Sequence, residues 1–249
     1  MKPLLFCCVF CAPFSMAGAA VLTGSVTSSG LGANIDLSAR GTLGWAAWNY
    51  TSTTTATGGG TIDASSRKSG GPTVGNAGYI SAIGVGGTAT SIRGVGGTTT
   101  TFSFTGGTGA ATTFGPATMG GVIAGDLNAV GHGVSLSILG DPSLTYRVSV
   151  WVTGQGATGT MTATLPGATT PSLTMVHGND SRNLGLFTYD FRPDTAGQAL
   201  NLTYTLTTDN TYLSSHVGIQ AVSVEVIPEP SSAIALVGGL ALLGLRRRR

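Results

Sequence analysis

Three histidines and nine carboxylates are the side chains in the central part of the chain that enzymes most often use for chemistry. The histidines are His132, His177 and His216, and the carboxylates between residues 20 and 227 belong to eight aspartates and Glu225. No histidine lies in an H-x-x-H or H-E-x-x-H pattern, so the sequence predicts no zinc site. No G-x-S-x-G motif marks a serine nucleophile, and most of the aspartates lie beside turn residues, where they cap backbone N–H groups. We therefore expect no catalytic residue, no metal and no cofactor, and predict that the protein is not an enzyme.

Aromatic side chains are the other candidates, because their rings can stack on the apolar faces of sugars. In "WAAWNY" a strand would direct Trp45 to one face and Trp48 with Tyr50 to the other, so one of the two sets can be exposed. Trp151 lies on the polar side of "LTYRVSVWV", opposite the tyrosine and valines, and is the better candidate for an exposed ring. Trp48, Tyr50 and Trp151 are thus candidates for ligand stacking, although such rings more often pack in a core or at its rim.

The composition predicts the kind of element that must position these residues. The chain of 249 residues contains 40 glycines, only 9% charged residues, two glutamates and two lysines. Helices usually need Glu and Lys on their solvent-facing side, whereas Thr and Val favour strands and Gly favours turns. A hydrophobic content of 41% is sufficient for a sizeable core. We therefore predict an all-β protein.

Short alternating runs place the candidate residues on strands. "LTYRVSVWV" and "LNLTYTLTT" alternate apolar and polar side chains, which is typical of strands that pack on one face only. The predicted strands span residues 21–27, 34–39, 42–50, 78–85, 99–104, 133–139, 144–153, 158–165, 184–191, 199–207 and 216–226. About ten short strands with frequent turns indicate a two-sheet, jelly-roll-like β-sandwich, which we assign to residues 20–227.

The charge of this central part excludes one class of partner. Residues 20–227 carry seven basic and nine acidic side chains, a net charge of about −2. The formal charge of +2 for the whole chain therefore comes from its two ends. A weakly acidic body without a basic face argues against nucleic acid as a partner.

The amino-terminal segment has the layout of an export signal. "MKPLLFCCVFCAPFSMAGAA" contains one lysine, an apolar run from Leu4 to Phe14 and small residues before a predicted cleavage after Ala19. All three cysteines of the chain lie within this segment, residues 1–19. We expect export, and a mature protein that contains no thiol and no disulfide.

The carboxyl-terminal segment combines three features in a fixed order. Pro228, Glu229 and Pro230 form an extended motif, because proline excludes helix at these positions. Ala233 to Leu245 then form an apolar run of 13 residues, which as a helix is roughly 20 Å long and shorter than a bilayer core of ~30 Å. The basic residues Arg246, Arg247, Arg248 and Arg249 follow, and would hold the end of such a short transmembrane helix on the cytoplasmic side.

This order of motif, apolar helix and arginine cluster resembles the PEP-CTERM sorting signal of Gram-negative bacteria over residues 228–249. The resemblance implies that an exosortase recognises Pro228-Glu229-Pro230 and removes the tail. It implies transient anchoring in the inner membrane through the helix, and then delivery to the outer surface or the extracellular matrix. Members of the family often accompany exopolysaccharide production. Glu229 accordingly takes the role of a recognition residue.

A second resemblance covers roughly residues 40–225. "GTLGWAAWNY", "FSFTGG", "RVSVWVTG" and "YDFRPDTAGQALNLTYTL" are similar to a β-sandwich module of secreted bacterial proteins with strands like those of a carbohydrate-binding module. Gly44 stands where the module usually has an aspartate. The resemblance implies a jelly-roll-like sandwich without implying one ligand.

These observations predict a non-catalytic protein of the cell surface or matrix that binds polysaccharide. Two alternatives remain open: a secreted hydrolase that acts on extracellular polysaccharide, and a purely structural matrix protein. A deep pocket that joins aspartates with histidine or tyrosine would favour the hydrolase. A shallow groove lined with aromatic rings would favour the binding protein, and uniformly polar strand faces would favour the structural protein.

Overall fold

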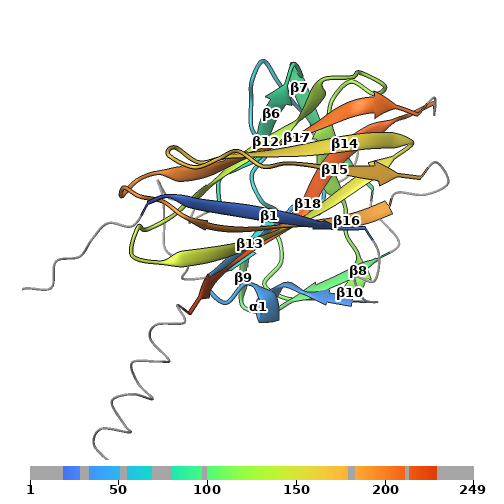
Figure 1. Ribbon diagram of the computed structural model, residues 1–249. Helices are drawn as coiled ribbons and strands as arrows, with labels where there is room; N and C mark the ends of the chain where they lie inside the picture. The colour runs from blue at the N-terminus through green and yellow to red at the C-terminus, as the bar shows by residue number, and fades with distance from the viewer. Residues whose placement is uncertain are drawn as a thin grey trace, which may run out of the picture.

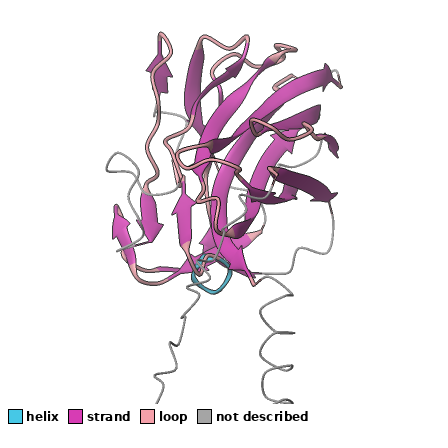
Figure 2. Ribbon diagram, turned by 60° about the vertical axis from the view of Figure 1, so that its left-hand side comes forward, coloured by secondary structure: helices cyan, strands magenta, loops and turns pink. Residues whose placement is uncertain are grey.

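The computed structural model describes residues 19–28, 34–50, 55–68, 80–96, 100–178, 183–210 and 213–228. Within these ranges the protein is almost entirely β-structure, as the composition predicts, and the one helix is a single turn, α1 (Figure 2). No helix in the described part of the chain is long and apolar enough to cross a membrane. The predicted signal segment up to residue 18 lies outside these residues, as do Glu229, Pro230, the apolar run and the arginine cluster.

The elements have the following bounds: β1 Val21–Thr27, β2 Asn34–Asp36, α1 Leu37–Arg40, β3 Gly44–Ala47, β4 Thr55–Thr57, β5 Ser66–Lys68, β6 Gly84–Gly87, β7 Ser91–Val95, β8 Thr101–Phe104, β9 Gly107–Gly109, β10 Phe114–Thr118, β11 Gly121–Ala124, β12 His132–Leu139, β13 Thr145–Gln155, β14 Ala157–Thr164, β15 Ser172–His177, β16 Asn183–Arg192, β17 Ala199–Asp209 and β18 His216–Ile227.

These strands form three sheets. The large sheet has the order β1-β16-β13-β18-β11-β7-β4, and β3 joins it beside β18, followed by β5 and β9. The five-stranded sheet has the order β15-β14-β17-β12-β6, and the small sheet has the order β10-β8-β2. All pairings are antiparallel except that of β2 with β8. Figure 1 shows the five-stranded sheet above the large sheet, and the small sheet with α1 below it.

The main core lies between the large and the five-stranded sheets. Tyr146, Val148 and Val150 of β13 are fully buried there against Leu202 and Tyr204 of β17. These are the apolar sides of the two alternating runs, so the predicted orientation of both strands is confirmed. Burial raises the pKa of the Tyr204 hydroxyl well above its ordinary value, because the ionised form would lose its hydration. Two sheets that pack face to face over one apolar layer form the arrangement of a β-sandwich.

A second apolar cluster lies on the opposite face of the large sheet. Trp45 and Trp151 pack there against Phe102 and Phe104 of the small sheet. The rings of Phe102 and Trp151 meet edge to face with their centroids 6.4 Å apart, a favourable geometry for aromatic pairs. The large sheet is therefore covered on both faces over much of its area.

The helix α1 replaces the second half of a predicted strand, residues 34–39. Asp36 lies at its N-cap, where the carboxylate Oδ1 accepts hydrogen bonds from Ser38 N and Ala39 N at 2.9 and 3.3 Å. This cap ends β2 after three residues and turns the chain away from the sheet. Arg40 is thereby placed at the last position of the helical turn.

Close contact between β12 and β17 makes the five-stranded sheet sensitive to one glycine. A Cβ atom at Gly133 would lie 2.0 Å from the backbone oxygen of Tyr204, so the two strands would have to separate. We expect Gly133→Ala to lower the free energy of unfolding by about 1–3 kcal/mol, the usual cost of overpacking. Gly115→Ala is the matched control because a Cβ atom there has no neighbour within 4 Å. Urea denaturation of both variants measures the difference, and equal stability would contradict the close approach.

Candidate functional site

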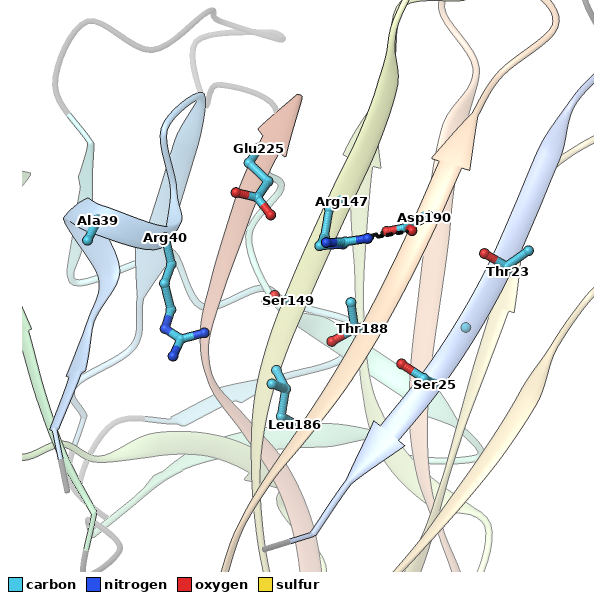
Figure 3. Close-up of a pocket in the computed structure, with 11 residues that line it drawn as sticks. Thr23, Ser25, Ala39, Arg40, Arg147, Ser149, Leu186, Thr188, Asp190 and Glu225 are labelled. Carbon is cyan, nitrogen blue, oxygen red and sulfur yellow. Dashed lines mark hydrogen bonds and ion pairs between the residues drawn. The ribbon is translucent and has the colours of Figure 1, made fainter. Parts of the chain in front are cut away.

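A groove of about 480 Å³ lies on the part of the large sheet's outer face that the small sheet leaves uncovered. Strands β1, β16, β13 and β18 form its floor and α1 forms one wall (Figure 3). The lining is mostly polar and consists of Thr23, Gly24, Ser25, Ala39, Arg40, Arg147, Ser149, Leu186, Thr188, Asp190 and Glu225. This groove is the candidate functional site.

The strand register arranges the floor of the groove in rows. Arg147 of β13 lies opposite Asp190 of β16 on one side and opposite Glu225 of β18 on the other. Two positions further along β13, Ser149 lies opposite Thr188, which itself pairs with Ser25 of β1. Because residues two apart on a strand share a face, one row of charged groups lies beside one row of hydroxyls.

A bidentate ion pair fixes the centre of the charged row. Arg147 donates from Nε to Oδ1 of Asp190 and from Nη2 to Oδ2, each at 2.8 Å. These hydrogen bonds raise the pKa of the Arg147 guanidinium, burial opposes the rise, and the charges of Asp190 and Glu225 add to it. Both side chains remain partly exposed, at 43% and 30%. The pair therefore holds two charged groups in a defined position at the surface of the sheet.

Arg40 and Glu225 are the remaining charged groups of the groove. Figure 3 shows Arg40 extending from α1 alongside β18, and Glu225 projecting from β18 itself. Among the residues that the structure describes, neither side chain forms an ion pair. The groove thus presents one guanidinium and one carboxylate that remain available to a ligand.

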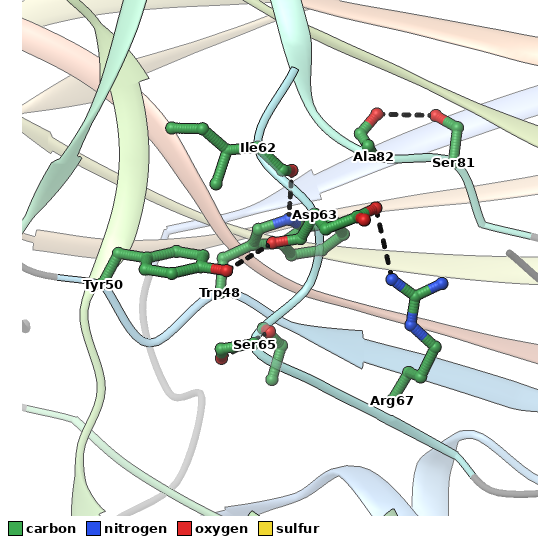
Figure 4. Close-up of polar contacts among 9 residues, drawn as sticks. Trp48, Tyr50, Ile62, Asp63, Ser65, Arg67, Ser81 and Ala82 are labelled. Carbon is green, nitrogen blue, oxygen red and sulfur yellow. Dashed lines mark hydrogen bonds and ion pairs between the residues drawn. The ribbon is translucent and has the colours of Figure 1, made fainter. Parts of the chain in front are cut away.

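The two candidate stacking residues of "WAAWNY" lie near a different part of the large sheet (Figure 4). The Trp48 side chain is fully buried in the main core, where its Nε1 donates to the backbone oxygen of Ile62 at 3.1 Å. Tyr50 is half-buried and donates from its hydroxyl to the backbone oxygen of Asp63 at 2.9 Å. Burial, and then the nearby Asp63 carboxylate, raise the pKa of the Tyr50 hydroxyl. Neither ring lines the groove, and Trp48 has no exposed face for a sugar.

The prediction that Trp151 is exposed is wrong. Its side chain points to the outer face of the large sheet, as the alternation of β13 indicates, but it is only 1% exposed. The small sheet covers it, with Phe102 against the ring. Trp45 is buried in the same cluster, on the opposite side of its strand from Trp48, as the sequence predicts.

The three histidines lie apart from the groove. His177 is buried, with Nε2 at 2.5 Å from the Tyr204 hydroxyl, and Nδ1 of His216 lies 2.6 Å from the backbone oxygen of Ser214. Nδ1 of His132 lies 3.5 Å from the carboxylate of Asp126. Within the described ranges, no three histidine, cysteine or acidic side chains come close enough together to hold a metal ion.

The side chains of the groove can form hydrogen bonds to a ligand. Hydroxyls of Ser and Thr both donate and accept, the Arg40 guanidinium donates, and the Glu225 carboxylate accepts. Both oxygens of the other carboxylate, Asp190, already accept hydrogen bonds from Arg147. The described lining contains no histidine or tyrosine beside these carboxylates. The arrangement can orient a polar ligand through several weak contacts.

Sequence reasoning did not identify these groove residues. The alternation of β13 indicates that Arg147 and Ser149 lie on its polar face, but it does not indicate their neighbours on other strands. The pairing of Arg147 with Asp190 and Glu225 depends on strand register between segments more than 40 residues apart, which no local pattern encodes.

Comparisons with known proteins show no family for this chain. No protein-family model matches the chain, and no curated protein matches it. Among solved structures, the chain is similar to the enzymatically active domain of tailspike protein 4 of bacteriophage CBA120, with a TM-score of 0.36 and 13% sequence identity. The aligned region covers 60% of this chain and 19% of the tailspike chain. A similarity at this level carries no argument about this protein.

The buried position of Trp151 can be tested through stability. We expect Trp151→Ala to lower the free energy of unfolding by about 3–5 kcal/mol, because it empties a large volume between the large and small sheets. Trp151→Phe, which keeps part of that volume, should lose less and secures a folded variant. Val176→Ala on β15, where the side chain is 67% exposed, is the control and should change stability by less than about 0.5 kcal/mol. If Trp151→Ala lowers the free energy of unfolding as little as the control does, the buried position of the ring is contradicted.

Proposed function

We propose that the protein is an exported, non-catalytic component of the cell surface or extracellular matrix of a Gram-negative bacterium, and that its groove binds polysaccharide. The observation that carries the proposal is the polar groove itself. Its floor offers a row of hydroxyls beside a row of charged groups, and its wall offers Arg40. Polysaccharides present many hydroxyl groups along an extended chain, and an open groove on a sheet allows such a chain to pass through.

The strand order supports a jelly-roll assignment. Strands β11 to β18 occur in the order β16-β13-β18-β11 in the large sheet and β15-β14-β17-β12 in the five-stranded sheet. This is the double-sheet order of a jelly roll, an architecture that includes lectin domains. The architecture hosts many ligands, so it supports the proposal only together with the groove.

The outer face of the five-stranded sheet favours a second candidate function, that of a structural matrix protein. Hydroxyl side chains follow its strands in register, and Oγ1 of Thr160 lies 3.2 Å from Oγ1 of both Thr174 and Thr207. Outward residues of three neighbouring strands are uncharged, and they include the apolar Val176 beside Thr158, Thr160, Thr162, Thr164, Ser172, Thr174, Asn201, Thr203, Thr205 and Thr207. Such a face can pack against other hydrated chains without charge repulsion.

The position of the tail supports sorting by an exosortase. The last strand in the described part of the chain, β18, ends at Ile227, directly before Pro228. It pairs with β13, β11 and β3, so its loss would disrupt the middle of the large sheet. Cleavage within the Pro228-Glu229-Pro230 motif would leave every described strand in place. We propose that the transmembrane helix holds the protein in the inner membrane only until this cleavage.

The sorting proposal predicts a change in mass. Protein isolated from its native host should lack both terminal segments, with the carboxyl-terminal cut near Pro228–Ser231. In a strain without exosortase the carboxyl-terminal segment should remain attached. Replacing Pro228 and Pro230 by alanine should also block the cut. Intact-mass spectrometry of outer-surface and inner-membrane fractions measures both effects. A full-length carboxyl terminus in the inner membrane of both strains would refute sorting.

The binding proposal predicts that filling the groove weakens binding to polysaccharide. We expect Ser25→Trp to weaken binding to the host's own extracellular polysaccharide at least about tenfold, which corresponds to 1.4 kcal/mol. Thr174→Trp makes the same change on the outer face of β15 and should bind like the unchanged protein. Affinity electrophoresis in gels that contain the polymer measures both variants. Loss of binding in Thr174→Trp alone would move the site to the five-stranded sheet.

A further inference from the structure

We infer that the groove selects neutral over acidic polysaccharide, and that Arg40 and Glu225 are the two groups that recognise the sugar. This inference rests on the proposed function of the groove and specifies the class of ligand. Three features of the groove support it. Arg147 and Asp190 already neutralise each other, uncharged hydroxyls lie beside them, and the Glu225 carboxylate would repel a carboxylate on the ligand.

Among the residues that the structure describes, four charged side chains line the groove, and two of them neutralise each other. The bidentate pair of Arg147 with Asp190 uses both carboxylate oxygens and two guanidinium nitrogens at 2.8 Å. One cation, Arg40, and one anion, Glu225, remain. The net charge offered to a ligand is therefore close to zero, and the groove has no excess of positive charge to attract a polyanion.

Glu225 lies within the charged row. It lies opposite Arg147 in the register of β13 and β18, and its charge contributes to the raised pKa of Arg147. An acidic polysaccharide that passed along the groove beside Arg40 would therefore also bring its carboxylates toward Glu225. Repulsion between like charges in a binding site weakens the binding of a partner that carries the same charge. Glu225 therefore discriminates against polysaccharides that contain uronic acids, because these carry carboxylates.

A neutral sugar matches the same two groups. Each sugar hydroxyl can donate one hydrogen bond and accept others, so hydroxyls along a bound chain can donate to Glu225 and accept from Arg40. Hydrogen bonds to charged groups are stronger than those between neutral groups, which makes these two contacts the main determinants of affinity.

The floor extends the same recognition along a chain. Ser149, Thr188 and Ser25 lie in register on three neighbouring strands, so their hydroxyls are spaced by roughly 4.8 Å, the distance between strands. Hydroxyls of this kind adapt as donors or acceptors and carry no charge. Arg147 is a positioning residue in this arrangement, because it holds Asp190 and keeps that carboxylate from the ligand.

The test compares neutral and acidic polymers on the full-length protein in mild detergent. Dextran, a soluble β-glucan, galactan and mannan represent neutral chains, and polygalacturonate, alginate and hyaluronan represent chains with carboxylates. We expect at least one neutral polymer to bind about tenfold or more tightly than any acidic one. The affinity for this neutral polymer should change less than about twofold between 0.05 and 0.5 M NaCl, because salt screens only interactions between charges and the polymer carries none.

Two charge-removing variants test the assigned roles. Arg40→Gln should weaken neutral-polymer binding about tenfold. Glu225→Gln should weaken neutral-polymer binding and at the same time raise the affinity for polygalacturonate several-fold, because the repulsion is gone. Arg67→Gln and Asp63→Asn remove the same charges from an ion pair outside the groove (Figure 4) and should change neither affinity. Thermal melting of all four variants verifies that they are folded.

The possible outcomes separate this inference from the proposed function. Tighter binding of an acidic polymer, or unchanged selectivity in Glu225→Gln, would overturn the inference and leave polysaccharide binding intact. Absence of binding to every neutral and acidic polymer would overturn the proposed function, and the inference with it. Binding that only the Arg67 and Asp63 variants reduce would place the ligand outside the groove and overturn the assignment of Arg40 and Glu225.

Discussion

The large sheet buries apolar side chains on both of its faces, and the position of the candidate site follows from the extent of that double cover. Strand β13 shows this directly, because burial alternates from Thr145 to Val150 and becomes continuous from Val150 to Gly154. Strand β18 is buried from His216 to Val224 and emerges only at its last three residues. The small sheet thus covers part of the outer face, and the groove lies on a part that it leaves open.

The charged groups of the groove contribute little to the stability of the fold, but they determine which charges a ligand meets. A partly exposed ion pair such as Arg147 with Asp190 stabilises a fold by only about 0.2–1 kcal/mol. The two apolar layers around the large sheet provide the main driving force for folding, since buried apolar area is the dominant favourable contribution. The same ion pair nevertheless fixes which charges a ligand meets, because it occupies one carboxylate and leaves Arg40 and Glu225 available.

The sequence predicts the long strands well because alternation is a local pattern. It predicts the groove poorly because the groove depends on contacts between distant segments. Strict alternation marks β13, β16 and β17, because each has one face in the main core. It does not mark β7, β11 or β15, which are short, and it gives no sign of a third layer over Trp151. That layer is formed by Phe102 and Phe104, about 50 residues earlier in the chain. Long-range packing and strand register also assemble the groove, so local patterns could name its residues only one strand at a time.

The last strand that the structure describes ends directly before the proposed sorting motif, so the proposed cleavage and the completion of the large sheet involve adjacent residues. β18 is the last of the described strands, yet it lies in the middle of the large sheet, where β13, β11 and β3 all pair with it. The sheet therefore cannot close until the chain up to Ile227 is available. If the tail holds this end in the inner membrane, the central strand stays attached to its anchor while the sheet forms. Cleavage after folding would then release a complete β-protein, whereas a cut within β18 would remove the strand on which both apolar layers depend.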